Sequence, residues 1–575
     1  MSVAVETPAI KGLGFKLDLS WPVFAVIALV LAILVVLPLF WLAVYAATDA
    51  NGQPTLANLI ALATDPALAR SFGVAIGMAA AVGVLSVVIA TPLAWLVART
   101  DLPGRSLVRA AVTASFVTPP FLGAIAWEIL AAPNTGLVNQ AYRSLLGLEA
   151  YDDPLVDIYT IEGLVFAIAC YTFPYVFTLV SNALDRVPSD IEDASNILGA
   201  GTWRTLRRVT IPMVMPAILA GALVAILQAL TMFGSPAILA LPAGFHVVTT
   251  KIWSLFQYPP KPGLAAAAAL PLLIITVLML WAQARILGRR GYETSGGKSG
   301  VPRLVQLGAW RWLAIVFVLA ILSLTVILPC LALVKAAVTA KVSDPLTWES
   351  LTLHHFHFVL FEFSATQLAM RNTLLLGFAT ATIGTALALV VVYLAARRAV
   401  PGAQVLGWLA TAPIAIPGIV LGVGLFLSYS RPPLVLYGTL WILLLGFLTI
   451  ELPAGYQQLS AAFKGVHTDL EEASRMLGGT RLQTLWRITA PLLRTSVLAT
   501  WCFIFIGTIR ELSATILLTT AETKLVSVII YDLNESGDLG AISVLGLLLL
   551  AVTFTIVWLV NRLPILGAAK LSQLR

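Results

Sequence analysis

Long apolar runs, separated by short polar loops, make up most of this chain of 575 residues. About 20 consecutive apolar residues cross a bilayer as one helix. The runs lack the alternation of a membrane β-barrel, and backbone groups in lipid need partners within their own segment. The pattern therefore predicts an all-α polytopic membrane protein with about twelve transmembrane helices, at residues 22–47, 70–97, 109–131, 160–183, 213–239, 264–286, 309–335, 371–396, 405–429, 435–458, 492–518 and 540–562.

One charged, polar stretch occurs twice between these runs. Residues 190–212 align without a gap with residues 469–491, which lie 279 positions later. An acidic start suits the N-terminus of a short helix, and a glycine suits its end. The two copies share Asp190/Asp469, Glu192/Glu471, Ala194/Ala473, Ser195/Ser474, Leu198/Leu477, Gly199/Gly478, Thr205/Thr484, Leu206/Leu485, Arg208/Arg487, Thr210/Thr489 and Pro212/Pro491. A polar stretch repeated in a membrane protein predicts two matching docking points for two copies of one soluble partner.

The repeat predicts an internal duplication. Residues 288–308 are polar and rich in glycine, which is typical of a linker. They divide the chain into residues 1–287 and residues 309–575, and we expect two pseudo-symmetric halves of six spans each. The expected cores are residues 66–286 and 367–562, and the repeated loops are residues 187–212 and 466–491.

The composition indicates a membrane environment for the chain, and the distribution of positive charge predicts which segments face the cytoplasm. The chain is 59% hydrophobic and 11% charged, whereas soluble domains contain about 25% charged residues. With the N-terminus inside, 25 of the 35 lysines and arginines fall on cytoplasmic segments. The positive-inside rule then places both repeated loops and both termini in the cytoplasm. The net charge of +7 is thereby explained without a nucleic-acid partner.

The repeated loops resemble the EAA loop of ABC importer permeases. The matching residues are Glu192, Asp193, Ala194, Ser195 and Gly199 in one copy, and Glu471, Glu472, Ala473, Ser474 and Gly478 in the other, each glycine 13 residues before a proline. Asp193 replaces a glutamate of the family pattern, and a serine stands at the second alanine in both copies. The resemblance implies that each loop couples the permease to a cytoplasmic ATP-binding subunit. It also implies two copies of that subunit, a periplasmic substrate-binding protein, the bacterial inner membrane and no cofactor.

The fused arrangement is most similar to the iron(III) branch of this family. The similar segments are residues 116–120 (FVTPP), 124–127 (AIAW), 233–236 (FGSP) and 510–515 (RELSAT). This resemblance implies alternating-access transport of ferric iron. The alternative is an ABC importer permease of the same kind that transports 2-aminoethylphosphonate, thiamine, a sugar phosphate or a polyamine.

The chain itself shows no nucleotide-binding loop. The nearest approach to a Walker A motif, residues 291–299, has one residue too many, so transport energy must come from a separate subunit. No catalytic set such as HExxH is present either. An ion-gradient transporter with twelve spans remains the competing class, and it would leave the repeated loops unexplained.

Ionisable residues inside the expected spans, and residues at an expected helix break, are candidates for the translocation pathway, since ionisable groups in a membrane face a cavity or a partner. These candidates are Glu128, Phe233, Ser235, Glu451, Arg510 and Glu511. The alternative is that Arg510 forms a structural ion pair with Glu511 or Glu451. We expect broken helix near residues 233–236 and 513–515, and close helix contacts at Gly73/Gly77 and Gly418/Gly422. The histidines at 354, 355 and 357 have no metal-site spacing, and no metal site is expected.

Overall fold

The computed structural model describes residues 20–49, 51–149, 152–288, 304–398 and 400–562. Within these ranges regular structure is helical, and the strand-like pairing consists of isolated bridges. The predicted all-α membrane fold is therefore confirmed. The expected linker lies largely outside the described residues, at 289–303.

The helices follow the chain in two similar series. The first is α1 (Ser20–Leu31), α2 (Leu37–Ala46), α3 (Ala57–Thr64), α4 (Pro66–Arg99), α5 (Arg105–Ala114), α6 (Pro120–Ala131), α7 (Leu137–Leu146), α8 (Ile161–Leu184), α9 (Ser189–Ile197), α10 (Thr202–Thr205), α11 (Ile211–Thr231), α12 (Gly234–Leu239), α13 (Val248–Ser254) and α14 (Pro262–Gly288). The second is α15 (Arg311–Leu322), α16 (Leu328–Val338), α17 (His354–His357), α18 (Ser364–Ala396), α19 (Gln404–Thr411), α20 (Gly418–Tyr429), α21 (Leu440–Phe463), α22 (Thr468–Met476), α23 (Arg481–Thr484), α24 (Ala490–Leu492), α25 (Arg494–Ile509), α26 (Thr515–Leu518), α27 (Val526–Ser536) and α28 (Leu539–Arg562).

Within the described residues, nine continuous helical stretches are long and apolar enough to cross a membrane. Two further candidates are bent pairs of helices, with an angle of 110° between Gln404–Ala415 and Gly418–Tyr429 and of 84° between Arg481–Leu492 and Arg494–Ile509. The predicted spans 109–131 and 405–429 are therefore not continuous helices. The first of them is divided into α5 and α6.

Proline explains these breaks. The residue before a proline is driven out of the helical region, and Pro119 and Ile416, each followed by a proline, are extended. The breaks expected near residues 233–236 and 513–515 are confirmed, since α11 ends at Thr231 and α25 at Ile509 before α12 and α26 begin.

The two series match element by element. Pro66 of α4 corresponds to Ser364 of α18, 298 positions later, whereas Ser189 of α9 corresponds to Thr468 of α22, 279 positions later. The offset changes between α6 and α8, where the first series carries the extra helix α7. An insertion of 19 residues on one side therefore accounts for the imperfect register of the repeat.

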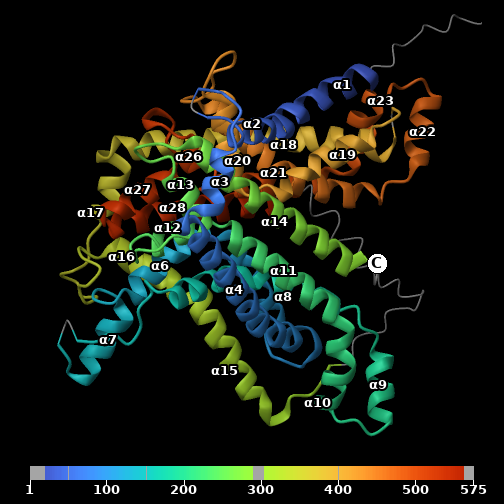
Figure 1. Ribbon diagram of the computed structural model, residues 1–575. Helices are drawn as coiled ribbons and strands as arrows, with labels where there is room; N and C mark the ends of the chain where they lie inside the picture. The colour runs from blue at the N-terminus through green and yellow to red at the C-terminus, as the bar shows by residue number, and fades with distance from the viewer. Residues whose placement is uncertain (1–19, 50, 150–151, 289–303, 399, 563–575) are drawn as a thin grey trace, which may run out of the picture.

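The first span of each series packs against the other series. Helix α2 lies against α14 and α20, and α16 lies against α28 and α6. Ala314 and Val318 of α15 belong to the apolar core formed by α4, α5, α8 and α11. Figure 1 shows two bundles that diverge toward α9 and α22, with α1 beside the bundle of α18 and α15 beside the bundle of α4.

Candidate docking loops and central cavity

Each repeated loop folds into a short helix, a glycine turn and a second short helix. Gly199 and Gly478 end α9 and α22 with φ of +82° and +81°, which is the left-handed region that favours glycine. A hydrogen bond between side chains then closes each turn, from Ser195 to Thr205 at 2.9 Å and from Ser474 to Thr484 at 3.0 Å. The two serines are therefore structural partners of the turn.

Exposed apolar side chains lie at the tip of each turn. Ile197 and Leu198 are each 86% exposed, and their counterparts Met476 and Leu477 are 88% and 91% exposed. The predicted residues Ala194, Glu472 and Ala473 are also exposed, beside these tips. Such apolar groups at matching positions on two polar loops form two equivalent surfaces that another protein can cover.

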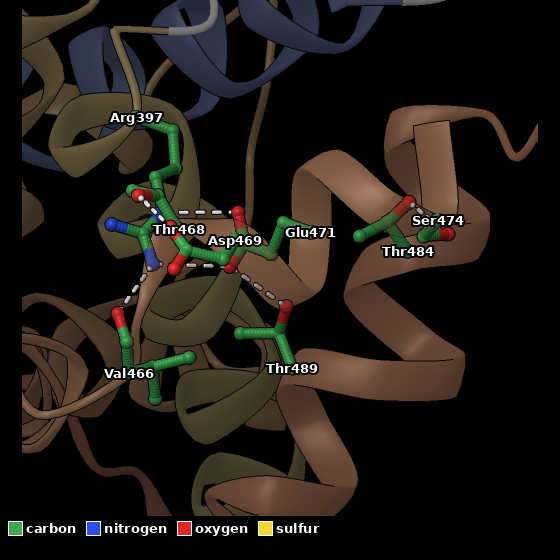
Figure 2. A network of polar contacts seen from close by, with 8 residues as sticks. All are labelled: Arg397, Val466, Thr468, Asp469, Glu471, Ser474, Thr484 and Thr489. Carbon is green, nitrogen blue, oxygen red and sulfur yellow. Dashed lines mark hydrogen bonds and ion pairs between the residues drawn. The ribbon is translucent and has the colours of Figure 1, made fainter. Parts of the chain in front are cut away.

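The first glutamate of each repeated loop, Glu192 or Glu471, turns inward. Glu471 is 5% exposed and accepts hydrogen bonds from Arg397 Nε at 3.0 Å and Arg397 Nη2 at 3.2 Å. Thr489 Oγ1 donates to the same carboxylate at 3.0 Å, and Arg397 Nη2 donates to the Val466 carbonyl at 2.9 Å (Figure 2). One partly buried arginine thus holds the chain before, within and after α22.

The first repeated loop has the same arrangement. Arg99 is 1% exposed and pairs with Glu192, and its Nη1 donates to the Val187 carbonyl at 3.2 Å. Thr210 Oγ1 donates to Glu192 Oε1 at 2.7 Å. Sequence reasoning identified the glutamates but not Arg99, Arg397, Thr210 or Thr489 as part of the site. The sequence could have indicated Thr210 and Thr489, because these two threonines are shared by the two copies of the repeat.

A cavity of about 400 Å³ lies between the two bundles. Its wall combines the broken segments of both series with polar side chains, among them Gln228, Thr231, Gln283, Arg510, Glu511 and Ser513. Arg510 and Glu511 both line this cavity, and their role in the translocation pathway stays a prediction. Glu511 Oε1 accepts a hydrogen bond from the Ala514 N–H at 2.9 Å, which fixes its carboxylate at the start of α26.

The other four predicted pathway residues, Glu128 among them, lie outside this wall. Glu451 is 8% exposed and packs against Gly507, where a β-carbon would overlap its carboxylate. Ser235 is buried and its Oγ donates to the Pro120 carbonyl at 3.0 Å. Phe233 is fully buried, with ring centroids 6.1 Å from Trp253 and 6.3 Å from Tyr531.

Aromatic side chains close the molecule on the side away from the repeated loops. Trp253 of α13 and Tyr531 of α27 are counterparts in the two series, and their rings meet at 5.9 Å. Contact between equivalent residues places them at the pseudo-two-fold axis. Together with Phe233, which lies between the cavity-lining residues Met232 and Gly234, they form an aromatic cluster that we call the aromatic plug.

Two further contacts flank this plug and join the halves. Glu128 accepts hydrogen bonds from the Tyr159 hydroxyl at 2.8 Å and from Asn534 Nδ2 of the second half at 2.9 Å. At the corresponding positions, Phe426 packs edge-on against Phe256 at 5.4 Å. Glu128 is therefore the polar member of an inter-half contact whose counterpart is aromatic.

No group of three or more histidine, cysteine, aspartate or glutamate side chains in the described residues is placed to hold a metal ion. In the histidine-rich segment, His357 Nδ1 lies 2.8 Å from Glu362 Oε1, and His355 Nε2 lies 3.1 Å from the Thr339 carbonyl. The described histidines of this segment thus interact with their own loop region.

Helical bundles around a cavity, with paired exposed loops at one end, define a membrane permease. Residues 90–291 and 388–564 match the family described as binding-protein-dependent transport system inner membrane component. These segments cover most of the chain in both halves, and the chain belongs to that family. The predicted likeness to ABC importer permeases is confirmed.

Curated relatives include ferric permeases. The chain is 26% identical over 477 residues to the ferric transport system permease protein FbpB of Actinobacillus pleuropneumoniae, covering 79% of this chain and 66% of that protein. It is 26% identical over 425 residues to the putative ferric transport system permease protein FbpB 1 of Haemophilus influenzae, covering 71% and 63%. The chain thus spans about two thirds of the length of these relatives. A solved bacterial alginate ABC transporter chain covers 49% of this chain at 16% identity, with a TM-score of 0.40.

Proposed function

We propose that this chain forms the translocation pathway of an ABC importer for ferric iron, with residues 1–287 and 309–575 as its two halves. The observation that carries the importer assignment is the pair of equivalent repeated loops, each with an exposed apolar tip and an arginine that anchors it. The names of the relatives described as ferric transport permeases support ferric iron as the cargo.

In this proposal each repeated loop docks on one of two cytoplasmic ATP-binding subunits. The tips at Leu198 and Leu477 enter an apolar groove of that subunit, with Asp193, Ala194, Glu472 and Ala473 around them. Both termini lie on the same, cytoplasmic side, in agreement with the excess of lysine and arginine there. A periplasmic binding protein delivers the cargo at the opposite face.

Transport then follows from relative motion of the two bundles. The closed plug at Trp253 and Tyr531 and the cavity beneath it correspond to a state that excludes the periplasm. When ATP draws the two ATP-binding subunits together, the repeated loops approach each other and the bundles rock about the cavity. Separation of Trp253 from Tyr531 would open the pathway to the binding protein.

A tetrahedral oxyanion is the second candidate cargo. The molybdenum transport system permease protein ModB of Escherichia coli is 27% identical over 190 residues and covers 32% of this chain. Arg510 in the cavity wall is the side chain that such a cargo would approach.

Uptake into proteoliposomes tests the proposal. Vesicles that hold this chain with its ATP-binding subunit and binding protein should accumulate ferric iron when ATP is supplied. Parallel vesicles receive molybdate or 2-aminoethylphosphonate, and a further set receives an ion gradient without ATP. Accumulation of either alternative solute in place of iron would contradict ferric iron as the cargo and would support the assignment as an ABC importer. Uptake that is driven by the ion gradient and does not depend on ATP would contradict the assignment as an ABC importer.

A further inference from the structure

Arg99 and Arg397 occupy equivalent places at the ends of the two longest membrane helices of the described residues. Arg99 is the last residue of α4, and Arg397 follows the last residue of α18. We infer that Arg99 and Arg397 are positioning residues for energy coupling, each fixing a repeated loop to the end of one long helix so that both move as one body. This inference rests on the proposed function, because it assigns a route by which motion of the ATP-binding subunits reaches the cavity.

Each arginine joins three segments that are otherwise linked only by short connections. In the second half, Arg397 holds the Val466 carbonyl before α22 and the Glu471 carboxylate within it, and that carboxylate binds Thr489 at the entrance of the next span. The Arg397 guanidinium also lies 4.5 Å above the ring of Phe463, near the end of α21. A planar guanidinium group that makes several hydrogen bonds at once restricts both the rotation and the separation of the segments that it joins.

Burial makes these contacts hard to exchange for water. The side chains of Arg99 and Glu192 are 1% and 14% exposed, and those of Arg397 and Glu471 are 21% and 7% exposed. Removing either partner of such a pair leaves an uncompensated charge in a poorly hydrated place. A loop that slides relative to its long helix would have to break these bonds, so motion of the loop is transmitted to the helix.

The long helices carry that motion to the cavity. Helix α4 packs along α8 and α11, and α18 packs along α21 and α25. Gln228 and Thr231 of α11 line the cavity, and Arg510 lies at the end of α25. A displacement of either anchor therefore moves one wall of the cavity through packed helices.

The first anchor is also bonded to the end of the linker and to the start of the second half. The Val305 N–H donates to the Arg99 carbonyl at 2.8 Å, and the Asp101 N–H donates to the Val305 carbonyl at 3.1 Å. Arg311 Nη2 also pairs with Asp101 Oδ2 at 2.5 Å. The N–H of Leu307 and this guanidinium hold the pKa of Asp101 below its ordinary value. The start of α15 therefore moves with the first anchor, in agreement with its packing beside α4.

The test compares Arg397→Gln and Arg99→Gln with Arg398→Gln, in which an exposed arginine next to the second anchor is neutralised. Each variant is assembled with the ATP-binding subunit and binding protein, and ATP hydrolysis and cargo uptake are measured together. In the anchor variants we expect assembly and hydrolysis to persist while cargo moved per ATP falls about tenfold. Arg397→Lys should recover part of the ratio, because one charged donor remains. An unchanged ratio in assembled Arg397→Gln would overturn the inference.

A second measurement does not depend on the cargo. Spin labels at Thr468→Cys on α22 and Leu375→Cys on α18 report the distance between loop and helix in a background without native cysteines. We expect this distance to stay constant between the nucleotide-free and ATP-bound complex, and to change or broaden when Arg397→Gln is added. A distance that changes with ATP in the parent complex would overturn the inference. Failure of the parent complex to transport iron would instead count against the proposed cargo alone.

Discussion

At the residue scale, the shape of each repeated loop depends on one backbone conformation. Gly199 and Gly478 have φ near +80°, where a β-carbon costs an L-residue about 1–2 kcal/mol. Gly199 faces open space, so the cost of alanine there is conformational and not steric. We expect Gly199→Ala and Gly478→Ala to loosen the loops, lower ATP-dependent uptake severalfold and leave membrane insertion intact, as measured in proteoliposomes.

Gly201→Ala is the matched control for this prediction. Gly201 also faces open space, but its φ of −72° suits any residue. The control should therefore transport like the parent protein. Equal uptake in Gly199→Ala and Gly201→Ala would show that the left-handed turn is not needed for coupling.

Residue-level prediction succeeded where the chemistry is local and failed where it is not. The acidic start and the glycine of each repeated loop follow from capping rules, and the sequence was sufficient to locate them. The partners of the glutamates could not be found in the same way. Arg99 and Arg397 are offset by 298 positions and the loops by 279, because α7 is inserted between them. Only folding brings each arginine to its glutamate.

At the element scale, the exposed tips of the repeated loops are the strongest candidates for partner contact. Leu198 and Leu477 expose 86% and 91% of their surface on otherwise polar loops. A carboxylate buried against an apolar groove without a partner costs several kcal/mol. We expect Leu198→Asp with Leu477→Asp to prevent co-purification of the ATP-binding subunit while this chain remains folded.

Leu198→Met with Leu477→Met is the conservative control, because methionine keeps an apolar side chain of similar volume at each tip. This variant should still retain the ATP-binding subunit. Normal co-purification with the aspartate variant would contradict docking at the tips.

Two glycine pairs of identical spacing behave differently in the fold. A β-carbon on Gly73 or Gly77 meets nothing within 4 Å, so the close helix contact predicted there is wrong. At Gly422 it would lie 3.1 Å from the Ala514 carbonyl oxygen, and at Gly418 it would lie 3.1 Å from Glu511 Oε1. The close contact predicted for the second pair is confirmed. Sequence spacing cannot distinguish the pairs, because the difference lies in the helix opposite.

This difference gives a matched test of packing at the cavity. Gly422→Leu should force α20 away from α26, at a cost of about 1–3 kcal/mol, and should lower the thermal stability of the purified protein. Gly77→Leu faces open space and should leave the stability near that of the parent. Similar melting temperatures for both variants would contradict the close approach at Gly422.

At the scale of the whole molecule, the halves share a plan but differ where they touch. The series of spans, the breaks near residues 233–236 and 513–515, and the repeated loops could be expected from the duplicated sequence. The breaks within residues 109–131 and 405–429 were not predicted. The two contacts beside the aromatic plug could not be expected from the duplication, because equivalent positions carry different chemistry. Glu128 bonds to Asn534 on one side of the axis, and Phe426 packs on Phe256 on the other. A duplication that keeps the fold can therefore assign polar and apolar contacts to opposite sides of one pathway.

The plug itself allows a direct test of alternating access. Trp253 and Tyr531 lie at equivalent positions with their rings 5.9 Å apart, so rocking of the bundles must separate them before cargo can pass. In a background lacking Cys170, Cys330 and Cys502, cysteines at both positions should react during ATP turnover with a short bifunctional thiol reagent. The bridged protein should lose uptake, and cleavage of the reagent should restore it. The single variants Trp253→Cys and Tyr531→Cys, treated alike, should keep transporting, since neither can bridge the halves. Full uptake by a protein shown to be bridged at this position would mean that the cargo leaves the cavity by another route, and that the aromatic plug is a fixed structural contact.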